Sequence, residues 1–217
     1  MRVRLLFMKN FIFVMVLLLA FAHCGKSQKV ATKNNMSNTN ELEIATLANG
    51  CFWCTEAVFQ RLKGVEKVES GYSGGKIANP TYKEICSGLT GHAECIQVTF
   101  DPKQISFAEI LEVFFKTHDP TTLNRQGNDT GTQYRSAIFY HSEAQKSTAT
   151  QLIEALDSAG AFNSKIVTEV TPTATFYKAE DYHQNYFNDN KNANPYCTFV
   201  IVPKLEKFEK VFKDKLK

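Results

Sequence analysis

Hydrophobic and polar residues follow two patterns along this chain, strand-like alternation and helical spacing, and together they predict an order of elements. Residues 41–48, ELEIATLA, alternate as a strand does and lead into GCFWC at residues 50–54. After this turn, residues 55–62 carry apolar side chains at helical spacing. The first part of the chain is therefore predicted to be a strand, a tight turn at Gly50 and a helix.

The same two patterns continue toward the C-terminus and complete a recognisable order. In chain order they predict a glycine-broken strand at 64–75, a strand at 93–100, a helix after Ser106, a strand at 135–141, a helix from Ser142 to about Gly160 and a strand at 165–171. The order βαββαβ is that of the ferredoxin-like split βαβ arrangement. We therefore predict an α+β fold with this core, added helices and a long C-terminal segment.

The last segment, residues 203–217, has an amphipathic pattern. Leu205, Phe208, Phe212 and Leu216 share one helical face, and lysines occupy the others. This pattern favours a helix docked on the domain. A helix lying on a membrane surface is the alternative.

Composition and charge restrict the class of protein. Of the 217 residues, 43% are hydrophobic and 22% are charged, which is typical of one globular domain. The net charge of +3 is spread along the chain, and no basic stripe is interleaved with aromatic residues. Nucleic acid is therefore not an expected partner.

The N-terminal region has the features of an export signal. Basic residues precede the apolar run at 11–22, which is too short to span a bilayer comfortably. We expect residues 1–24 to be a signal peptide of the lipoprotein type, with Cys24 as the candidate lipidated residue. His23 departs from the small residue that such a site requires before the cysteine. An uncleaved membrane anchor is the alternative.

Polar residues without periodicity follow the signal, so residues 25–40 are expected to be a flexible tether. The folded domain is expected at 41–217. Either N-terminal reading places this domain outside the cytoplasm, in the cell envelope or periplasm and tethered to the membrane if Cys24 is lipidated.

Two of the six cysteines, Cys51 and Cys54, lie where a strand gives way to a helix. Backbone N–H groups and the helix dipole favour a thiolate at such a position. A zinc site lacks a second compact ligand pair, so no metal is expected. A thioredoxin-like dithiol fits less well because Phe52 and Trp53 separate the cysteines. The remaining alternative is that both cysteines are buried and have only a structural role. Without Cys24, an odd number of cysteines is left, so at least one thiol of the domain is free or transiently paired.

Loops elsewhere in the chain add polar groups that could join this turn. These groups are Tyr82, Glu94, Asp129 and Tyr134. In the split arrangement, the first strand-to-helix turn can lie beside the start of the third strand. We therefore expect Cys51 to lie next to Glu94.

Several motifs in a fixed order resemble those of the A-type peptide methionine sulfoxide reductases. They are GCFW, GYSGG, NPTYKEICSGLTGHAE, DPTTLNRQGNDTGTQYRSAIF and AEDYHQNY, and the resemblance covers about residues 44–200. It implies an enzyme that reduces the S epimer of methionine sulfoxide, free and in proteins, through a cysteine thiolate, a sulfenic acid and then a disulfide. It further implies repair of oxidised proteins, no bound cofactor, and an external thioredoxin or thioredoxin-like reductant.

The resemblance also implies roles for residues. Cys51 is the nucleophile, and Glu94 gives a proton to the sulfoxide oxygen once burial keeps it protonated. Tyr82 and Tyr134 donate hydrogen bonds to that oxygen. The substrate-binding residues are Phe52 and Trp53, which form the pocket for the methyl group, and Asp129, which contacts the substrate backbone.

The resolving cysteine departs from the commonest family pattern, which has glycine where this chain has Cys54. The candidates are Cys197, in a segment that is predicted to be ordered, and Cys54. We favour Cys197 as the first resolver and leave Cys54 open, with Cys86 and Cys95 expected to be structural. The chain is expected to be a monomer. The alternative functions are a thiol-disulfide exchange enzyme and a non-catalytic methionine-binding envelope protein.

Overall fold

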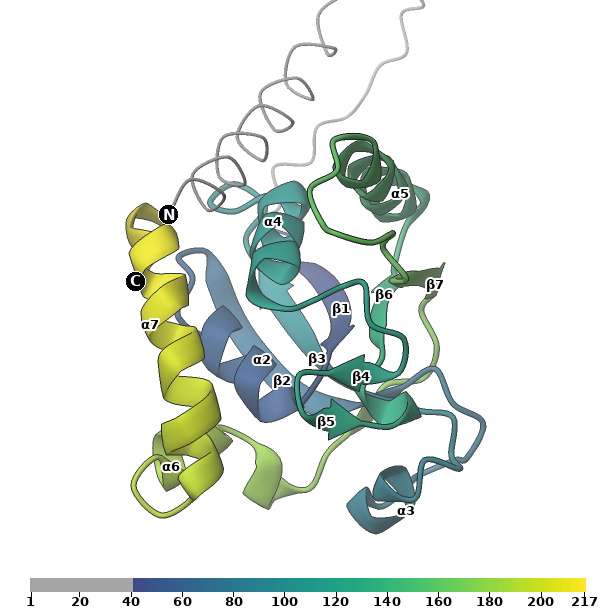
Figure 1. Ribbon diagram of the computed structural model, residues 1–217, viewed down its shortest axis with the longest axis vertical. Helices are drawn as coiled ribbons and strands as arrows, with labels where there is room; N and C mark the ends of the chain where they lie inside the picture. The colour runs from purple at the N-terminus through teal and green to yellow at the C-terminus, as the bar shows by residue number, and fades with distance from the viewer. Residues whose placement is uncertain (1–40) are drawn as a thin grey trace, which may run out of the picture.

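The computed structural model describes residues 41–217 (Figure 1). The predicted signal peptide, the tether and Cys24 lie outside these described residues. The description below therefore concerns the predicted reductase domain.

A six-stranded sheet forms the centre of the described chain, in the order β7-β6-β1-β3-β2-β8. Its inner strands are β1 (Glu43–Asn49), β2 (Val65–Ser73), β3 (Ala93–Phe100) and β6 (Ser136–Tyr140). These four strands pair with one another in antiparallel fashion. This arrangement, together with the helices between the strands, is the predicted ferredoxin-like βαββαβ core.

Two short strands extend the sheet at its edges. β7 (Glu169–Pro172) pairs with β6 in parallel, and β8 (Tyr177–Lys178) pairs with β2. The turn between these strands carries Phe176, which packs on a small apolar cluster formed by Ala48, Ala93, Cys95, Ala137 and Phe139. This chain segment covers part of the sheet face that the main helices leave free.

Helices cover the other face and enclose the main core (Figure 1). They are α2 (Phe52–Phe59) and α4 (Phe107–Thr117), with α7 (Val202–Val211) packed against both and α5 (Glu143–Ser158) beside α4, β6 and β7. The core is rich in fully buried phenylalanines, among them Phe59, Phe100 and Phe114. Burial of such side chains is the main favourable contribution to folding, at about 1.5 to 3 kcal/mol for each one.

Local signals place several helix ends where the sequence predicts them. Ser106 caps α4 and forms a capping box with Glu109, and the Ser142 side chain caps α5. α2 begins earlier than the predicted 55–62, directly after Cys51, so its first turn contains the residues between the two cysteines.

Small elements in the loops were missed by the hydrophobic pattern. They are α3 (Tyr82–Cys86), the hairpin of β4 (Arg125–Gln126) and β5 (Asp129–Thr130), η2 (Thr132–Tyr134), β8, η3 (Asp181–His183) and α6 (Tyr186–Asn190). Each is five residues or fewer, which is too short to show a period. These elements nevertheless carry most of the loop residues of the site.

The C-terminal helix is docked on the domain. A π-helical turn, η4 (Cys197–Ile201), runs into α7, and 3-10 turn η5 (Lys213–Lys215) follows it. Leu205, Phe208 and Phe212 are almost fully buried, and Leu216 pairs with Leu62. The apolar face thus packs on the domain. Within residues 41–217, no helix combines the length and apolar character needed to cross a bilayer.

Candidate active site

The turn from β1 into α2 presents Cys51 at the N-terminus of a helix. Gly50 has φ +98°, and a Cβ there would meet the Gln126 side chain at 2.6 Å, so both conformation and space require glycine. Cys51 is the N-cap residue, and its carbonyl accepts hydrogen bonds from the backbone N–H groups of Cys54 and Thr55. The thiol is therefore placed by the strand end and the first helical turn.

Burial dominates the ionisation of Cys51. The residue is only 8% exposed, and this burial raises the pKa of its thiol well above the ordinary value, with a further increase from a hydrogen bond to Cys54. The sequence argument that a helix N-terminus favours a Cys51 thiolate is therefore incomplete. In the resting site, loss of water around the sulfur is the largest influence on this pKa.

Cys54 carries the more acidic thiol of the pair. Its hydrogen bond with Cys51 lowers its pKa to about 7, burial opposes this, and the Lys204 ammonium contributes further lowering. One negative charge can therefore be held between the two sulfurs near neutral pH. Because the hydrogen bond joins both groups, the proton can move between them.

Glu94 lies beside this pair, as the sequence predicts. It occupies the start of β3, is 1% exposed, and its Oε2 accepts a hydrogen bond from the Phe52 backbone N–H at 3.1 Å. Burial raises the pKa of Glu94 to about 8, and the Asp129 charge adds to this. The carboxyl is therefore mostly protonated at neutral pH and can donate a proton.

Two phenols share this electrostatic environment. Tyr82 opens α3 and Tyr134 closes η2, and both are half-buried. Burial raises the pKa of each phenol, and Glu94 raises both further. Tyr134 also interacts with Cys51. Both hydroxyls thus remain protonated donors near Glu94, and that of Tyr134 also lies near Cys51.

Aromatic rings line the helix side of the site. Phe52 is buried against Tyr72 and Tyr82, with ring centroids 5.8 and 6.4 Å away. Trp53 is half-buried and stacks on Tyr186 at 3.7 Å with an interplanar angle of 6°. The Glu56 carboxylate of α2 supports this stack by accepting the backbone N–H groups of Asn185 and Tyr186.

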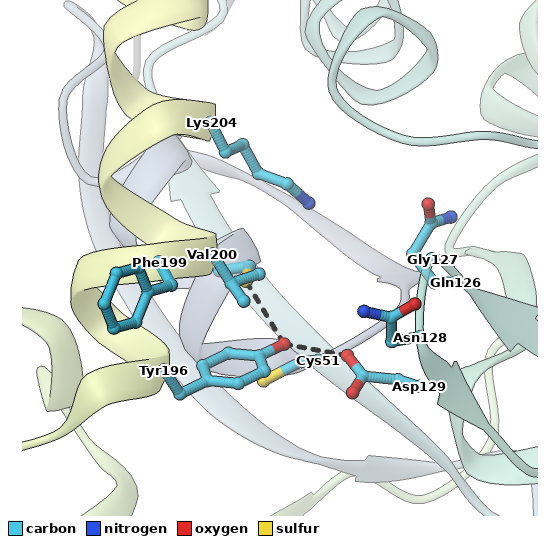
Figure 2. Close-up of a pocket in the computed structure, with 10 residues that line it drawn as sticks. Cys51, Gln126, Gly127, Asn128, Asp129, Tyr196, Phe199, Val200 and Lys204 are labelled. Atoms are coloured by element: carbon cyan, nitrogen blue, oxygen red, sulfur yellow. Dashed lines mark hydrogen bonds between the residues drawn. The ribbon is translucent and has the colours of Figure 1, made fainter.

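A cavity of about 290 Å³ opens onto Cys51 and Cys54 from the other side (Figure 2). It lies between the β4–β5 hairpin, including Asp129, and the start of the C-terminal helix, including Tyr196, Phe199, Val200 and Lys204. The Tyr196 hydroxyl donates to Asp129 Oδ2 at 2.7 Å and lies 3.7 Å from Cys54 Sγ. The Tyr196 ring also meets Trp53 edge-on at 6.0 Å. Tyr196 therefore lies between this cavity and the aromatic wall, which is formed by Phe52 and Trp53.

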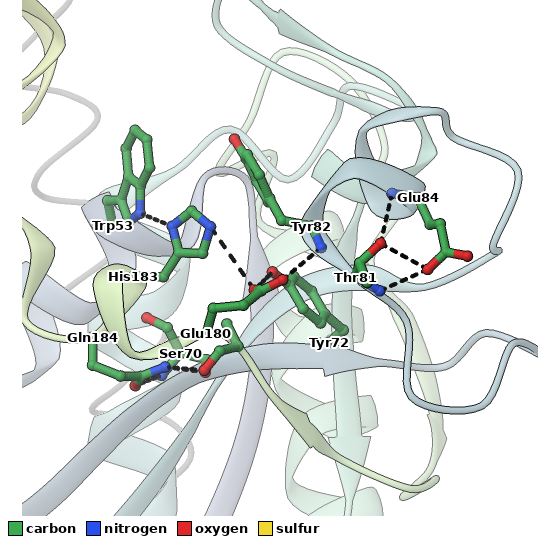
Figure 3. A network of polar contacts seen from close by, with 10 residues as sticks. Trp53, Ser70, Tyr72, Thr81, Tyr82, Glu84, Glu180, His183 and Gln184 are labelled. Atoms are coloured by element: carbon green, nitrogen blue, oxygen red, sulfur yellow. Dashed lines mark hydrogen bonds and ion pairs between the residues drawn. The ribbon is translucent and has the colours of Figure 1, made fainter.

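A polar network ties the wall to the loops behind it (Figure 3). The Trp53 indole N–H donates to His183 Nδ1 at 3.0 Å. Glu180 accepts from the Tyr72 hydroxyl and from the Tyr82 backbone N–H, both at 2.8 Å. His183 Nε2 lies 4.0 Å from Glu180 Oε2.

The other cysteines differ in their surroundings. All five cysteines of the described chain are free thiols. Cys197 is fully buried in η4 and interacts electrostatically with Cys54. Cys95 is buried, and its thiol donates to the Gly71 carbonyl at 3.6 Å. Cys86 is exposed at the end of α3, which does not fit a core role. Within residues 41–217, no group of three or more potential ligands could hold a metal ion.

Sequence reasoning assigned no role to Tyr196, His183, Tyr186 or Lys204, although all four contact or face the site. Two of them, His183 and Tyr186, belong to the motif AEDYHQNY, and Tyr196 directly precedes Cys197. For these three residues, the sequence signal was their position within or next to a segment that resembles the family or carries a candidate cysteine. Lys204 had none, because its role depends on how the C-terminal helix docks.

Comparison with known proteins identifies the family. The family model for peptide methionine sulfoxide reductase matches residues 43–216. The peptide methionine sulfoxide reductase MsrA of Saccharolobus solfataricus is 56% identical over 176 residues, which are 81% of this chain and 98% of that relative. The MsrA of Leptospira borgpetersenii is 56% identical over 170 residues, 78% of this chain and 94% of that relative.

Solved structures agree with these sequence matches. The reduced form of Mxr1 from Saccharomyces cerevisiae superposes with a TM-score of 0.64 at 36% identity, covering 76% of this chain and 95% of that one. Methionine sulfoxide reductase A of Corynebacterium diphtheriae gives a TM-score of 0.64 at 35% identity, covering 78% of this chain and 84% of that one. Fold and sequence thus lead to the same family.

Proposed function

This chain belongs to the peptide methionine sulfoxide reductase family. We propose a role for each of its site residues in the reaction of that family. The enzyme reduces methionine sulfoxide to methionine. We propose that its substrate is the S epimer, free and within proteins, so that it repairs oxidised proteins. The observation that carries the proposal is a buried, protonated Glu94 bonded to the residue next to Cys51.

The first step is attack of the Cys51 sulfur on the sulfoxide sulfur. At rest Cys54, the more acidic thiol, holds the charge; transfer of the Cys51 proton to Cys54 then gives the form in which Cys51 attacks as a thiolate. Glu94 donates a proton to the sulfoxide oxygen, which makes the sulfur a better electrophile. The oxygen is transferred to Cys51, methionine leaves, and Cys51 becomes a sulfenic acid.

Tyr82 and Tyr134 stabilise the oxygen as it gains negative charge. Their raised pKa values keep both hydroxyls as donors, and their interaction with Glu94 places them at the same side of the site. Trp53 and Phe52 bind the methyl group, and Asp129 contacts the substrate backbone at the cavity. For that contact, substrate competes with the Tyr196 hydroxyl for Asp129.

Resolution of the sulfenic acid requires a second thiol. The sequence favours Cys197, and that preference stays a prediction. The contacts support the other candidate, because Cys54 is hydrogen-bonded to Cys51 and has the lower pKa, while Cys197 interacts with Cys54. We propose that Cys54 attacks the sulfenic sulfur, which releases water and forms a Cys51–Cys54 disulfide. Cys197 would then act second, by exchange with Cys54.

An external dithiol must reduce the resulting disulfide, because each turnover oxidises two thiols that the next cycle needs in reduced form. A thioredoxin-like protein is the proposed partner, since thiolate exchange needs an attacking thiol and an accessible disulfide. Cys51 and Cys54 both line the cavity, through which such a partner would reach the disulfide.

Mass spectrometry after a single turnover tests this reading. Reduced enzyme is mixed with methionine S-sulfoxide without reductant, alkylated and digested. We expect one methionine per enzyme and a peptide in which Cys51 and Cys54 are linked. Absence of methionine would contradict reductase activity and support a binding protein. Activity on scrambled disulfides without methionine release would support the exchange enzyme instead, which the low pKa of Cys54 also permits.

We also propose that the enzyme is exported and acts in the cell envelope or periplasm, tethered through a lipid on Cys24. The support is the N-terminal sequence alone. Asn128 heads an Asn-Asp-Thr triplet and lines the cavity, so a glycan there would obstruct the site. This favours a bacterial envelope and implies a reductant outside the cytoplasm. Fractionation of wild type and Cys24→Ala tests the proposal, and cytoplasmic protein with an intact N-terminus would refute it.

A further inference from the structure

The buried imidazole of His183 has a contact pattern that the reaction does not explain. His183 is 1% exposed and lies in η3, far along the chain from the GCFWC turn. Its ring packs against Phe52, Trp53 and Tyr82, with centroid distances of 5.1, 5.6 and 4.3 Å. A single side chain thus contacts both walls of the methyl pocket and one of the oxygen-binding phenols.

Its hydrogen bonding fixes the state of the ring. Nδ1 accepts the Trp53 indole N–H at 3.0 Å, so the proton of the neutral imidazole is on Nε2. Nε2 has no hydrogen-bond partner within bonding distance and lies 4.0 Å from Glu180 Oε2 (Figure 3). A protonated ring would put a second donor against the indole donor and break the contact. Burial lowers the pKa of His183, which keeps the ring neutral.

The indole has no alternative acceptor among the contacts of the described chain. Its N–H is the only polar group of the side chain, and buried indoles normally pair this group. Stacking on Tyr186 holds the plane of the ring but leaves it free to slide within that plane. The hydrogen bond to His183 fixes this remaining freedom.

We propose that His183 is a positioning residue, which holds the Trp53 indole in the orientation that binds the substrate's methyl group. Glu180 is itself held by Tyr72 and by the backbone of Tyr82. The same carboxylate therefore holds the start of α3, which carries Tyr82, and lies next to the imidazole of His183. Only the kinetic part of this inference rests on the proposed function.

Two substitutions of His183 distinguish the effect of its hydrogen-bond acceptor from the effect of its aromatic ring. His183→Phe keeps an aromatic ring in the pocket wall but removes the acceptor. His183→Asn removes the ring but can place its amide oxygen where Nδ1 lies. His141 supplies the matched control, because it is a partly buried histidine at the end of β6 whose Nε2 lies 2.8 Å from Thr46 Oγ1. The same two substitutions there should leave the site unchanged.

Steady-state kinetics gives the first readout. For His183→Phe we expect kcat/KM for methionine sulfoxide to fall about fivefold to tenfold, the effect of one net hydrogen bond. The loss should be in KM, with kcat within about twofold, because the wall binds substrate and transition state alike. His183→Asn should restore kcat/KM to within about twofold of wild type. If Phe will not fit, His183→Leu removes the acceptor with less volume.

Fluorescence gives the second readout and does not depend on turnover. Trp53 is the only tryptophan in the chain, so the emission maximum reports this one indole. We expect a shift in His183→Phe or His183→Leu and none in His183→Asn or the His141 variants. Unchanged emission and kcat/KM in the variants that lack the acceptor would overturn the proposal. Equal losses in the Asn and Phe variants would also overturn it, since packing rather than the acceptor would then matter.

Discussion

Replacement of Glu94 by Gln should lower activity and raise stability, each with its own dependence on pH. The amide keeps the size of the side chain and can still accept the Phe52 N–H, but it cannot give up a proton to the sulfoxide oxygen. General acid catalysis is worth about 10²- to 10⁴-fold, so we expect a loss of that size in the single-turnover rate.

The pH profile follows from the two thiols and the acid. The rate of wild type should rise as pH passes about 7, where the thiol pair gains its charge, and fall as pH passes about 8, where Glu94 loses its proton. Glu94→Gln has no such proton to lose. The pH profile of this slower variant should therefore still rise as pH passes about 7 but should not fall as pH passes about 8.

The stability effect has the opposite sign. Burial raises the pKa of Glu94 from 4.5 to about 8, so the folded state holds a proton that the unfolded state releases above pH 4.5. Wild type therefore loses unfolding free energy between pH 4.5 and 8, at about 1.4 kcal/mol per pH unit. From pH 4.5 to pH 7 this is about 3 kcal/mol. Glu94→Gln has no such proton to release. The difference in unfolding free energy between Glu94→Gln and wild type should therefore increase by about 3 kcal/mol from pH 4.5 to pH 7.

Two measurements check the prediction. Methionine release in a single turnover gives the rate, and urea unfolding at several pH values gives the free energy. Glu112→Gln is the control, because Glu112 on α4 also has a pKa raised by burial but lies outside the site. A wild-type rate in Glu94→Gln, or a falling limb that persists near pH 8, would refute the assignment of Glu94 as the acid. A stability difference that does not change with pH would refute the raised pKa.

The remaining predictions concern the thiols. Cys51→Ser should release no methionine, since a hydroxyl lacks the nucleophilicity of the thiolate, and turnover measured by chromatography would contradict this. Cys54→Ser should release one methionine and leave a sulfenic acid that dimedone labels, whereas Cys197→Ser should form the Cys51–Cys54 disulfide. A Cys51–Cys197 link in wild type would reverse that order. Lys204→Met should move the rising limb of the single-turnover profile to higher pH, because the ammonium lowers the pKa of Cys54, and an unmoved limb would exclude this role.

Local pattern was enough to predict the core and the place of the nucleophile. Alternation and helical spacing depend on which side chains face the core, so they predicted the inner strands, α4 and α5. Ser106 and Ser142 marked helix starts because capping is a contact within one turn. Gly50 marked the turn that presents Cys51, because its φ of +98° suits glycine. The split βαβ order then sufficed to put Glu94 next to that turn.

Tertiary packing alone decided how the site ionises and what holds it in place. Burial determines the raised pKa of Cys51 and of Glu94. The extent to which folding removes water from these two side chains cannot be predicted from the sequence. The partners of the pocket come from distant positions, with His183 bonded to Trp53 and Tyr196 bonded to Asp129. Periodicity describes neighbours three or four residues apart, whereas desolvation and charge act through space between segments that only the folded chain brings together.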